Sequence, residues 1–215
     1  EIIMATTASP YGLRAVNHIG GTPYAGSTRL LPITLAALDG NPAVTNTTPI
    51  YNGSVVNLNT SGTVILQPNT GAGGGGTAAV FTDGVIGVFV GCTYTDPNTG
   101  VLTFAQSWNG NTATDAKAYV IDDPDVVYQI QAAGPITNLE LGENFYFNAV
   151  QTGDATTGNS TTAATTVGNF ATTAGFPFRL IDFVDGPTSA IGDAFTDLLC
   201  KFNAGQHSYN DSTGV

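Results

Sequence analysis

The sequence predicts a mainly β protein, an antiparallel sandwich or barrel-like domain with long loops and little or no helix. Three observations support this prediction. Short runs of β-branched and aromatic residues recur between Gly, Pro, Asn and Asp turns, at the spacing typical of a sandwich or barrel. No segment has apolar residues at helical spacing over three turns, and residues 191–195 suffice for one turn at most. The chain of 215 residues can also bury a core without a metal or a disulfide.

Strand signals continue from residue 28 almost to the end of the chain. The clearest hairpin joins residues 85–95 to residues 101–107 through the turn at residues 96–100, DPNTG. Pro presets φ there, Asp and Asn hydrogen-bond the nearby backbone, and Gly accepts φ > 0. The other strands are expected at residues 28–35, 54–58, 62–66, 118–121, 126–131, 144–148, 178–184 and 198–202, the pair 54–58 and 62–66 forming a second hairpin.

Two domain-level features are expected. Residues 1–27 are rich in Gly, Pro and Ser and lack periodicity, so they are expected to form an extended N-terminal arm rather than a helix or strand. The alternative is an N-terminal segment folded onto its own core. Residues 28–215 are expected to form a single β domain, with a Thr- and Gly-rich loop or excursion at about residues 152–175.

The charge pattern excludes several classes of partner. Only 10% of residues are charged and the formal net charge is −11. Nucleic-acid binding needs clustered Lys and Arg, so neither nucleic acid nor an anionic membrane is an expected partner. No apolar run is long enough to cross a bilayer, and the N-terminus lacks the pattern of a secretory signal. The cations are few and scattered, namely Arg14, Arg29, Lys117, Arg179 and Lys201.

No catalytic residues stand out, so the protein is not expected to be an enzyme or to need a cofactor. His18 and His207 have no nucleophile or metal-spaced partner nearby and are interpreted as surface or packing residues. Most carboxylates lie at strand ends beside Pro or Gly, which is ordinary turn chemistry. Calcium is the more plausible role for one acidic loop, whose weak candidate ligands are Asp122, Asp123 and Asp125, although their spacing does not match an EF-hand.

Two further groups of residues are interpreted as core. Cys92 and Cys200 lie in apolar stretches and are expected to be buried free thiols rather than a disulfide. Four aromatic residues are more typical of a core than of a sugar-stacking platform, which they could otherwise form: Tyr94, Trp108, Tyr119 and Tyr128.

The N-terminal segment resembles the signature of a family of tailed-phage structural proteins from aquatic phages. This N-terminal resemblance lies in residues 9–21, SPYGLRAVNHIGG, and residues 25–29, AGSTR. Members of this family are capsid decoration (cement) proteins or other virion structural proteins. The resemblance runs from about residue 9 to near the end of the chain, outside residues 36–41 and the Thr-rich stretch. These motifs carry no catalytic meaning. Further segments similar to the family pattern are residues 87–95, 118–125, 179–184 and 192–197.

The resemblance implies a structural virion protein that decorates and stabilises the outer surface of an icosahedral phage capsid. It would bind the major capsid protein and itself, as a homo-oligomer and specifically a trimer. Since Tyr and Arg often dominate interfaces, the hypothesised capsid or subunit contacts are Tyr11, Leu13, Arg14, His18, Tyr24 and Arg29. The alternative is a phage fibre or adhesin-type module that binds host glycans through exposed aromatic residues and a loop-bound cation.

Overall fold

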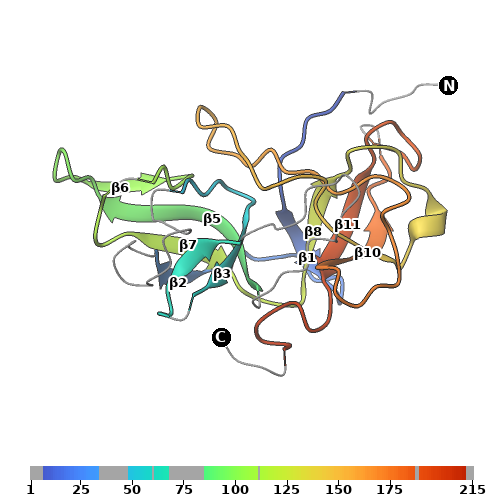
Figure 1. The fold of residues 1–215 in the computed structure, drawn as a ribbon, viewed down its shortest axis with the longest axis horizontal. Coiled ribbons are helices and arrows are strands. Elements are labelled where there is room, and N and C mark those ends of the chain that lie inside the picture. The colour runs from blue at the N-terminus through green and yellow to red at the C-terminus, as the bar shows by residue number, and fades with distance from the viewer. Residues whose placement is uncertain are drawn as a thin grey trace.

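The chain forms two antiparallel β-sheets that lie side by side (Figure 1). The computed structural model describes residues 7–33, 48–59, 61–67, 85–110, 112–186 and 189–211. Within these ranges the one helical element is a short 3-10 helix, η1, at Asn138–Glu140. The described residues include no helix with the length and apolarity to span a bilayer.

Sheet A has five strands, on the right of Figure 1. Their order across the sheet brings together distant parts of the chain, because the N-terminal strand pairs with a strand from the middle of the sequence. The strands in spatial order are β1 (Arg14–His18), β8 (Val126–Gln131), β11 (Asp197–Phe202), β10 (Phe178–Phe183) and β9 (Asn144–Phe145).

Sheet B has six strands, on the left of Figure 1. Five follow one path in the order β2 (Arg29–Pro32), β7 (Lys117–Ile121), β5 (Val85–Thr95), β3 (Val55–Leu58) and β4 (Val64–Leu66). The sixth, β6 (Leu102–Ala105), pairs with the C-terminal part of β5. An isolated bridge between Ile33 and Val64 connects the two ends of this path.

Strand β5 contributes to two hydrophobic cores, one on each of its faces. Val85 and Val88 pack into the inter-sheet core, which otherwise consists mainly of sheet A side chains. Ile86 and Phe89 pack into a second core that lies within sheet B. Because both faces of the strand are covered, β5 has the nearly continuous apolar sequence expected of a buried strand rather than strict alternation.

Gly87 lets β5 approach the neighbouring strand β7 closely. Its φ is +153°, and a Cβ atom at this position would lie 1.9 Å from the carbonyl oxygen of Ile121. No side chain fits in that space. Gly87 therefore fixes the register at which β5 and β7 pair, next to the Val88–Ile121 pair.

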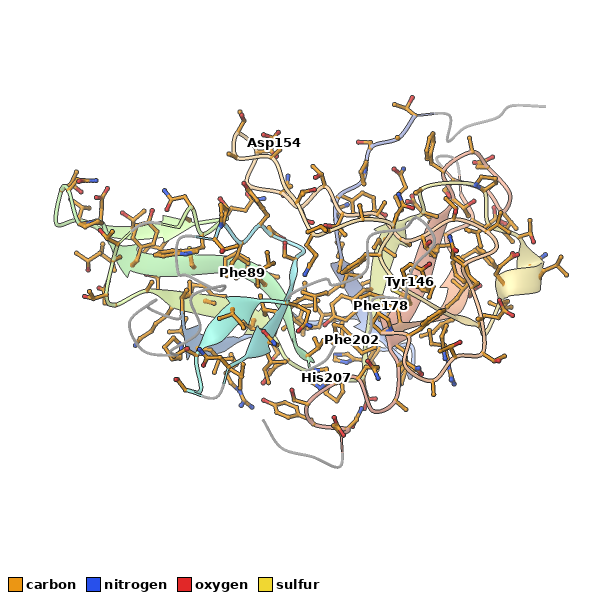
Figure 2. The ribbon with its side chains drawn as sticks, viewed as in Figure 1. Phe89, Tyr146, Asp154, Phe178, Phe202 and His207 are labelled. Carbon is orange, nitrogen blue, oxygen red and sulfur yellow. The ribbon has the colours of Figure 1, made fainter. Side chains whose placement is uncertain are left out.

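Aromatic rings fill the inter-sheet core (Figure 2). The Phe178 ring centroid lies 4.8 Å from that of Phe147 and 5.4 Å from those of Phe145 and Phe202. Tyr128 continues the cluster, with its ring edge-on to Phe202 at 5.5 Å. These offset and edge-on contacts stabilise the core beyond the burial of apolar area.

The predicted fold class and both predicted hairpins are confirmed. The structure is mainly β with antiparallel sheets. Hairpin β5–β6 turns where the DPNTG segment predicts, and hairpin β3–β4 pairs Val56 with Leu66. Of the strand expected at residues 28–35, residues 34–35 lie outside the described ranges. The strand expected at residues 144–148 is shorter and ends at Phe145.

The prediction that the N-terminal segment forms no strand is wrong for residues 14–18. These residues form β1, which pairs antiparallel with β8. Leu13 is only 2% exposed and packs in the inter-sheet core. The described part of the segment is thus folded onto the chain's own core, and deleting it would remove a strand together with a core side chain.

The Thr-rich stretch at residues 152–175 contains no strand longer than an isolated bridge. It nevertheless packs closely against the rest of the chain. Ala164 bridges both Ala132 and Phe147, and Asn159 bridges Asn52. Thr162 and Thr165 are buried. Most of the stretch therefore lies along the two sheets, and the short loop around Asp154 projects from it (Figure 2).

The residues interpreted as core are largely confirmed. Trp108 and Tyr128 are completely buried and Tyr94 is 8% exposed, so these three cannot form a sugar-stacking surface in the folded chain, whereas Tyr119 is only half-buried. Cys92 and Cys200 are both free and buried. Burial raises the pKa of the Cys92 thiol to about 12, which keeps it protonated at neutral pH.

Replacing Gly87 with Ala tests the close approach of β5 to β7. The added methyl group meets backbone atoms that cannot move aside alone, so we expect the variant to lose about 2–4 kcal/mol of unfolding free energy. Gly100→Ala is the matched control, since Gly100 has φ +68° with nothing within 4 Å of a Cβ. It should lose only about 1 kcal/mol. Equal losses in urea unfolding would contradict this role of Gly87.

Candidate interaction surfaces

Four residues of the N-terminal segment are candidate contacts with a partner and are called the N-terminal face: the half-buried Tyr11 and the exposed Arg14, Val16 and Ile19. The Tyr11 hydroxyl donates a hydrogen bond to Asp197 Oδ1 at 3.0 Å, which ties it to β11. Burial, with the negative charge of Asp197 adding to it, raises the pKa of Tyr11 above its ordinary value. Arg14 places its guanidinium carbon 4.6 Å from the centre of the Tyr11 ring. Val16 and Ile19 are 40% and 53% exposed.

A second group of predicted contact residues is drawn together around Asp122, in the turn after β7. Arg29 Nε lies 2.8 Å from Asp122 Oδ2, and the Tyr209 hydroxyl donates to the same oxygen at 2.8 Å. The Arg29 guanidinium also lies over the Tyr209 ring, 5.5 Å from its centre. Arg29 is thus already engaged by two side chains of its own chain.

The other two carboxylates of this turn lie near a histidine and a lysine. His18 Nδ1 lies 3.6 Å from Asp123 Oδ2, and Lys201 Nζ lies 3.9 Å from Asp125 Oδ1. Asp123 also accepts the Asp125 backbone N–H at 2.8 Å. Among the described residues no three His, Cys, Asp or Glu side chains converge as metal ligands. The structure therefore does not bring Asp122, Asp123 and Asp125 together as calcium ligands, because each carboxylate lies beside a different basic side chain.

The predicted contact residues do not form one surface. Arg14 belongs to the N-terminal face, whereas His18 and Arg29 lie beside the acidic turn. The Tyr24 ring lies 5.9 Å from the His18 ring, and its hydroxyl donates to the Ser27 carbonyl. Leu13 is a core residue and is not available to a partner in this conformation.

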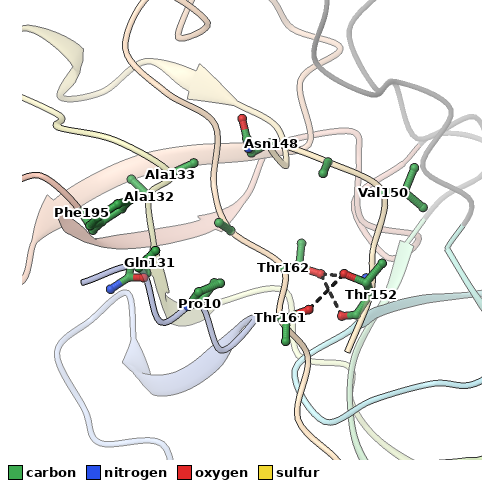
Figure 3. A pocket seen from close by; sticks show the side chains of 13 residues that line it. Pro10, Gln131, Ala132, Ala133, Asn148, Val150, Thr152, Thr161, Thr162 and Phe195 are labelled. Atoms are coloured by element: carbon green, nitrogen blue, oxygen red, sulfur yellow. Dashed lines mark hydrogen bonds between the residues drawn. The ribbon is translucent and has the colours of Figure 1, made fainter. Parts of the chain in front are cut away.

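A pocket of about 300 Å³ lies between the N-terminal segment, the end of β8 and the Thr-rich stretch (Figure 3). Its volume is at the lower end of the range of small-molecule sites. The Thr152 and Thr161 hydroxyls lie 3.0 Å apart, and the Thr152 N–H donates to Thr162 Oγ1 at 3.4 Å. No lining residue is titratable, the lining being Ala8, Pro10, Gln131, Ala132, Ala133, Asn148, Ala149, Val150, Thr152, Thr161, Thr162, Ala163 and Phe195.

The third surface, strand β6 with the residue before it, is one that the sequence did not indicate. Val101, Leu102 and Phe104 are 60%, 59% and 69% exposed. The Leu102 and Phe104 side chains point away from the sheet B core, because Cys92 and Tyr94 of that core pair with Ala105 and Thr103 instead. The alternation of apolar residues 102 and 104 alone would predict the opposite orientation.

Comparisons of the chain with protein-family models, curated proteins and solved structures give no match. Function is therefore inferred from the chain's own residues and from the resemblance of its N-terminal segment. The surfaces described above contain side chains suited to binding other macromolecules: a stacked Arg and Tyr, and a row of exposed apolar residues.

His207 is a buried histidine close to Asp122 and Asp123 of the acidic turn, and its burial leads us to predict that the stability of the fold depends on pH. The side chain is completely buried, and its Nδ1 accepts the Tyr209 N–H at 3.3 Å. Burial lowers the pKa of His207 from 6.5 to about 4, against the opposing effect of the Asp122 and Asp123 charges. As the pH falls, His207 is therefore protonated at a higher pH in the unfolded chain than in the folded chain. The neutral histidine's contribution to stability is complete above about pH 6.5 and is lost as the pH falls toward 4.

Between pH 7 and pH 4.5, we expect wild type to lose about 2–3 kcal/mol more unfolding free energy than His207→Phe, whose ring keeps the packing against Phe202. Urea unfolding at the two pH values measures this difference. His18→Asn, measured alongside, separates the loss of a buried imidazole from the loss of any histidine. Equal losses in wild type and His207→Phe would contradict the prediction.

Proposed function

We propose that this chain is a structural virion protein that decorates and stabilises the outer surface of an icosahedral phage capsid. It binds the major capsid protein and further copies of itself. Support comes from the resemblance of residues 9–29 to the signature of phage decoration proteins. The resemblance further implies trimers, and glycan binding as a fibre or adhesin-type module is the competing role.

The observation that carries the proposal is the construction of the N-terminal face. Asp197 holds the Tyr11 hydroxyl, and Tyr11 in turn supports the Arg14 guanidinium. Both side chains are thus partly ordered before a partner arrives, which lowers the entropic cost of binding. Val16 and Ile19 add exposed apolar area further along the same segment, where the Ile19 N–H donates to the Asp125 carbonyl. Arg and Tyr are among the residue types that most often dominate binding energy.

The charge distribution favours Arg14 as a contact with the shell. Three other cations already have partners within the chain: Arg29 and Lys201 lie at carboxylates of the acidic turn, and Arg179 donates to Asn144 Oδ1 at 3.0 Å. Arg14 instead lies over a neutral ring and is exposed. It can therefore bind a carboxylate of another protein without first breaking an ion pair within its own chain.

Decoration stabilises a shell by mass action. A protein that binds the assembled lattice but not the separate subunits shifts the equilibrium toward the lattice. Repetition of the contact around a symmetry axis adds avidity, because each further contact of an oligomer is intramolecular. A modest contact area on each copy is then sufficient.

Co-sedimentation with expanded phage heads that lack the protein tests the role. Wild type should bind saturably, at a fixed ratio to the major capsid protein. The double variant Arg14→Glu with Val16→Asp should bind at least about tenfold more weakly, because charge and apolar contact are both lost. Lys117→Glu is the matched charge reversal, on the exposed side of β7, and should bind like wild type.

The possible outcomes test capsid decoration and the use of the N-terminal face separately. A folded wild-type chain that fails to bind heads would overturn the proposal and favour the glycan-binding alternative. Equal binding by wild type and the double variant would instead show that the shell is contacted by a different surface.

A further inference from the structure

Strand β6 is an edge strand, and among the described residues no other segment pairs with its outer edge. Three other sheet edges are protected. The outer edge of β1 is covered by residues 22–24, where the His18 N–H donates to the Thr22 carbonyl at 2.8 Å. Strand β9 exchanges hydrogen bonds with Ala171, and β2 contains Pro32, which cannot donate to a further strand.

The backbone groups of Leu102 and Phe104 point to the outer edge of sheet B. The Asp96 N–H donates to the Val101 carbonyl at 2.9 Å, which makes Asp96 and Val101 a hydrogen-bonded pair of the hairpin. Such pairs alternate with non-bonded pairs along an antiparallel ladder. Leu102 and Phe104 occupy the non-bonded positions opposite Thr95 and Thr93, so their N–H and C=O groups face away from β5.

The side chains of β6 are also unlike those of a protected edge. Natural edge strands carry Lys, Pro, a bulge or an inward charge that prevents pairing with another chain. Residues 101–107, VLTFAQS, contain no charged residue and no Pro. The pairing of β6 with β5 is regular over its four residue pairs. Exposed apolar side chains at residues 101, 102 and 104 lie on this edge.

We propose that β6 binds β6 of a second copy of the chain in antiparallel orientation, so that two copies of sheet B join into one continuous sheet. A net charge of −11 makes two copies repel each other over most of their surface. A charge-free edge is where they can approach most closely. With the two-fold axis at Thr103, Leu102 lies opposite the partner's Phe104, and both outward backbone groups of each residue are paired.

This contact is distinct from the proposed contact with the shell and does not depend on it. An antiparallel contact between identical strands is two-fold and gives dimers, whereas the family resemblance implies trimers. The two assemblies differ in mass. A failure of self-pairing therefore leaves the binding of phage heads to be decided by its own experiment.

Sedimentation equilibrium of the full chain tests the proposal. At concentrations up to about 100 µM, wild type should have twice the mass of the 22.0 kDa chain. Phe104→Glu places like charges at the contact and should raise the dimer dissociation constant at least about tenfold. Leu139→Glu is the matched control, because Leu139 lies in η1, away from sheet B, and is 87% exposed.

Hydrogen exchange provides a readout that does not depend on a substitution. The amides of Leu102 and Phe104 should be protected in concentrated wild type and should exchange faster on dilution. Phe104→Thr, which keeps the β propensity while removing the aromatic ring, replaces Phe104→Glu if that variant unfolds. A monomeric wild type, a trimer that Phe104→Glu leaves intact, or unprotected amides at both positions would overturn the proposal.

Discussion

The close packing of strand β5 against β7 at Gly87 is the constraint on which the rest of the structure depends. At this point the backbones approach so closely that a Cβ atom would lie 1.9 Å from the Ile121 carbonyl oxygen. The approach sets the β5–β7 register, which in turn directs Val88 into the inter-sheet core and Phe89 into the sheet B core. Strand β5 thereby contributes to both cores. Its C-terminal part also pairs with β6, whose Leu102 and Phe104 side chains are exposed.

The sequence predicts the turns and hairpins well, because short-range interactions within each segment determine their backbone conformation. The DPNTG turn identified the β5–β6 hairpin because each of its residues favours one backbone conformation. The sequence did not identify β1, since its strand character comes from pairing with β8, more than a hundred residues away. Leu13 looked like an anchor for a partner because sequence does not distinguish a side chain that docks on another protein from one that docks on its own core.

The candidate surfaces were predicted only in part. Tyr11 and Arg14 were identified from their residue types, and the structure places one over the other. The orientation of Leu102 and Phe104 was not predictable, because the register with β5 sends Thr103 and Ala105 inward despite their lower apolarity. The two candidate surfaces lie on different sheets, with the N-terminal face at β1 of sheet A and the β6 edge on sheet B. Under the proposed function, separate surfaces would let one chain contact the shell and a second copy at the same time.

Cryo-electron microscopy of expanded heads saturated with the protein tests the central claim, decoration of the capsid, most directly. The account predicts ordered density outside the shell that fits the two sheets, with Arg14 and Val16 against the major capsid protein. Bare shells under saturating conditions, or density for the protein only at the tail or fibres, would contradict it.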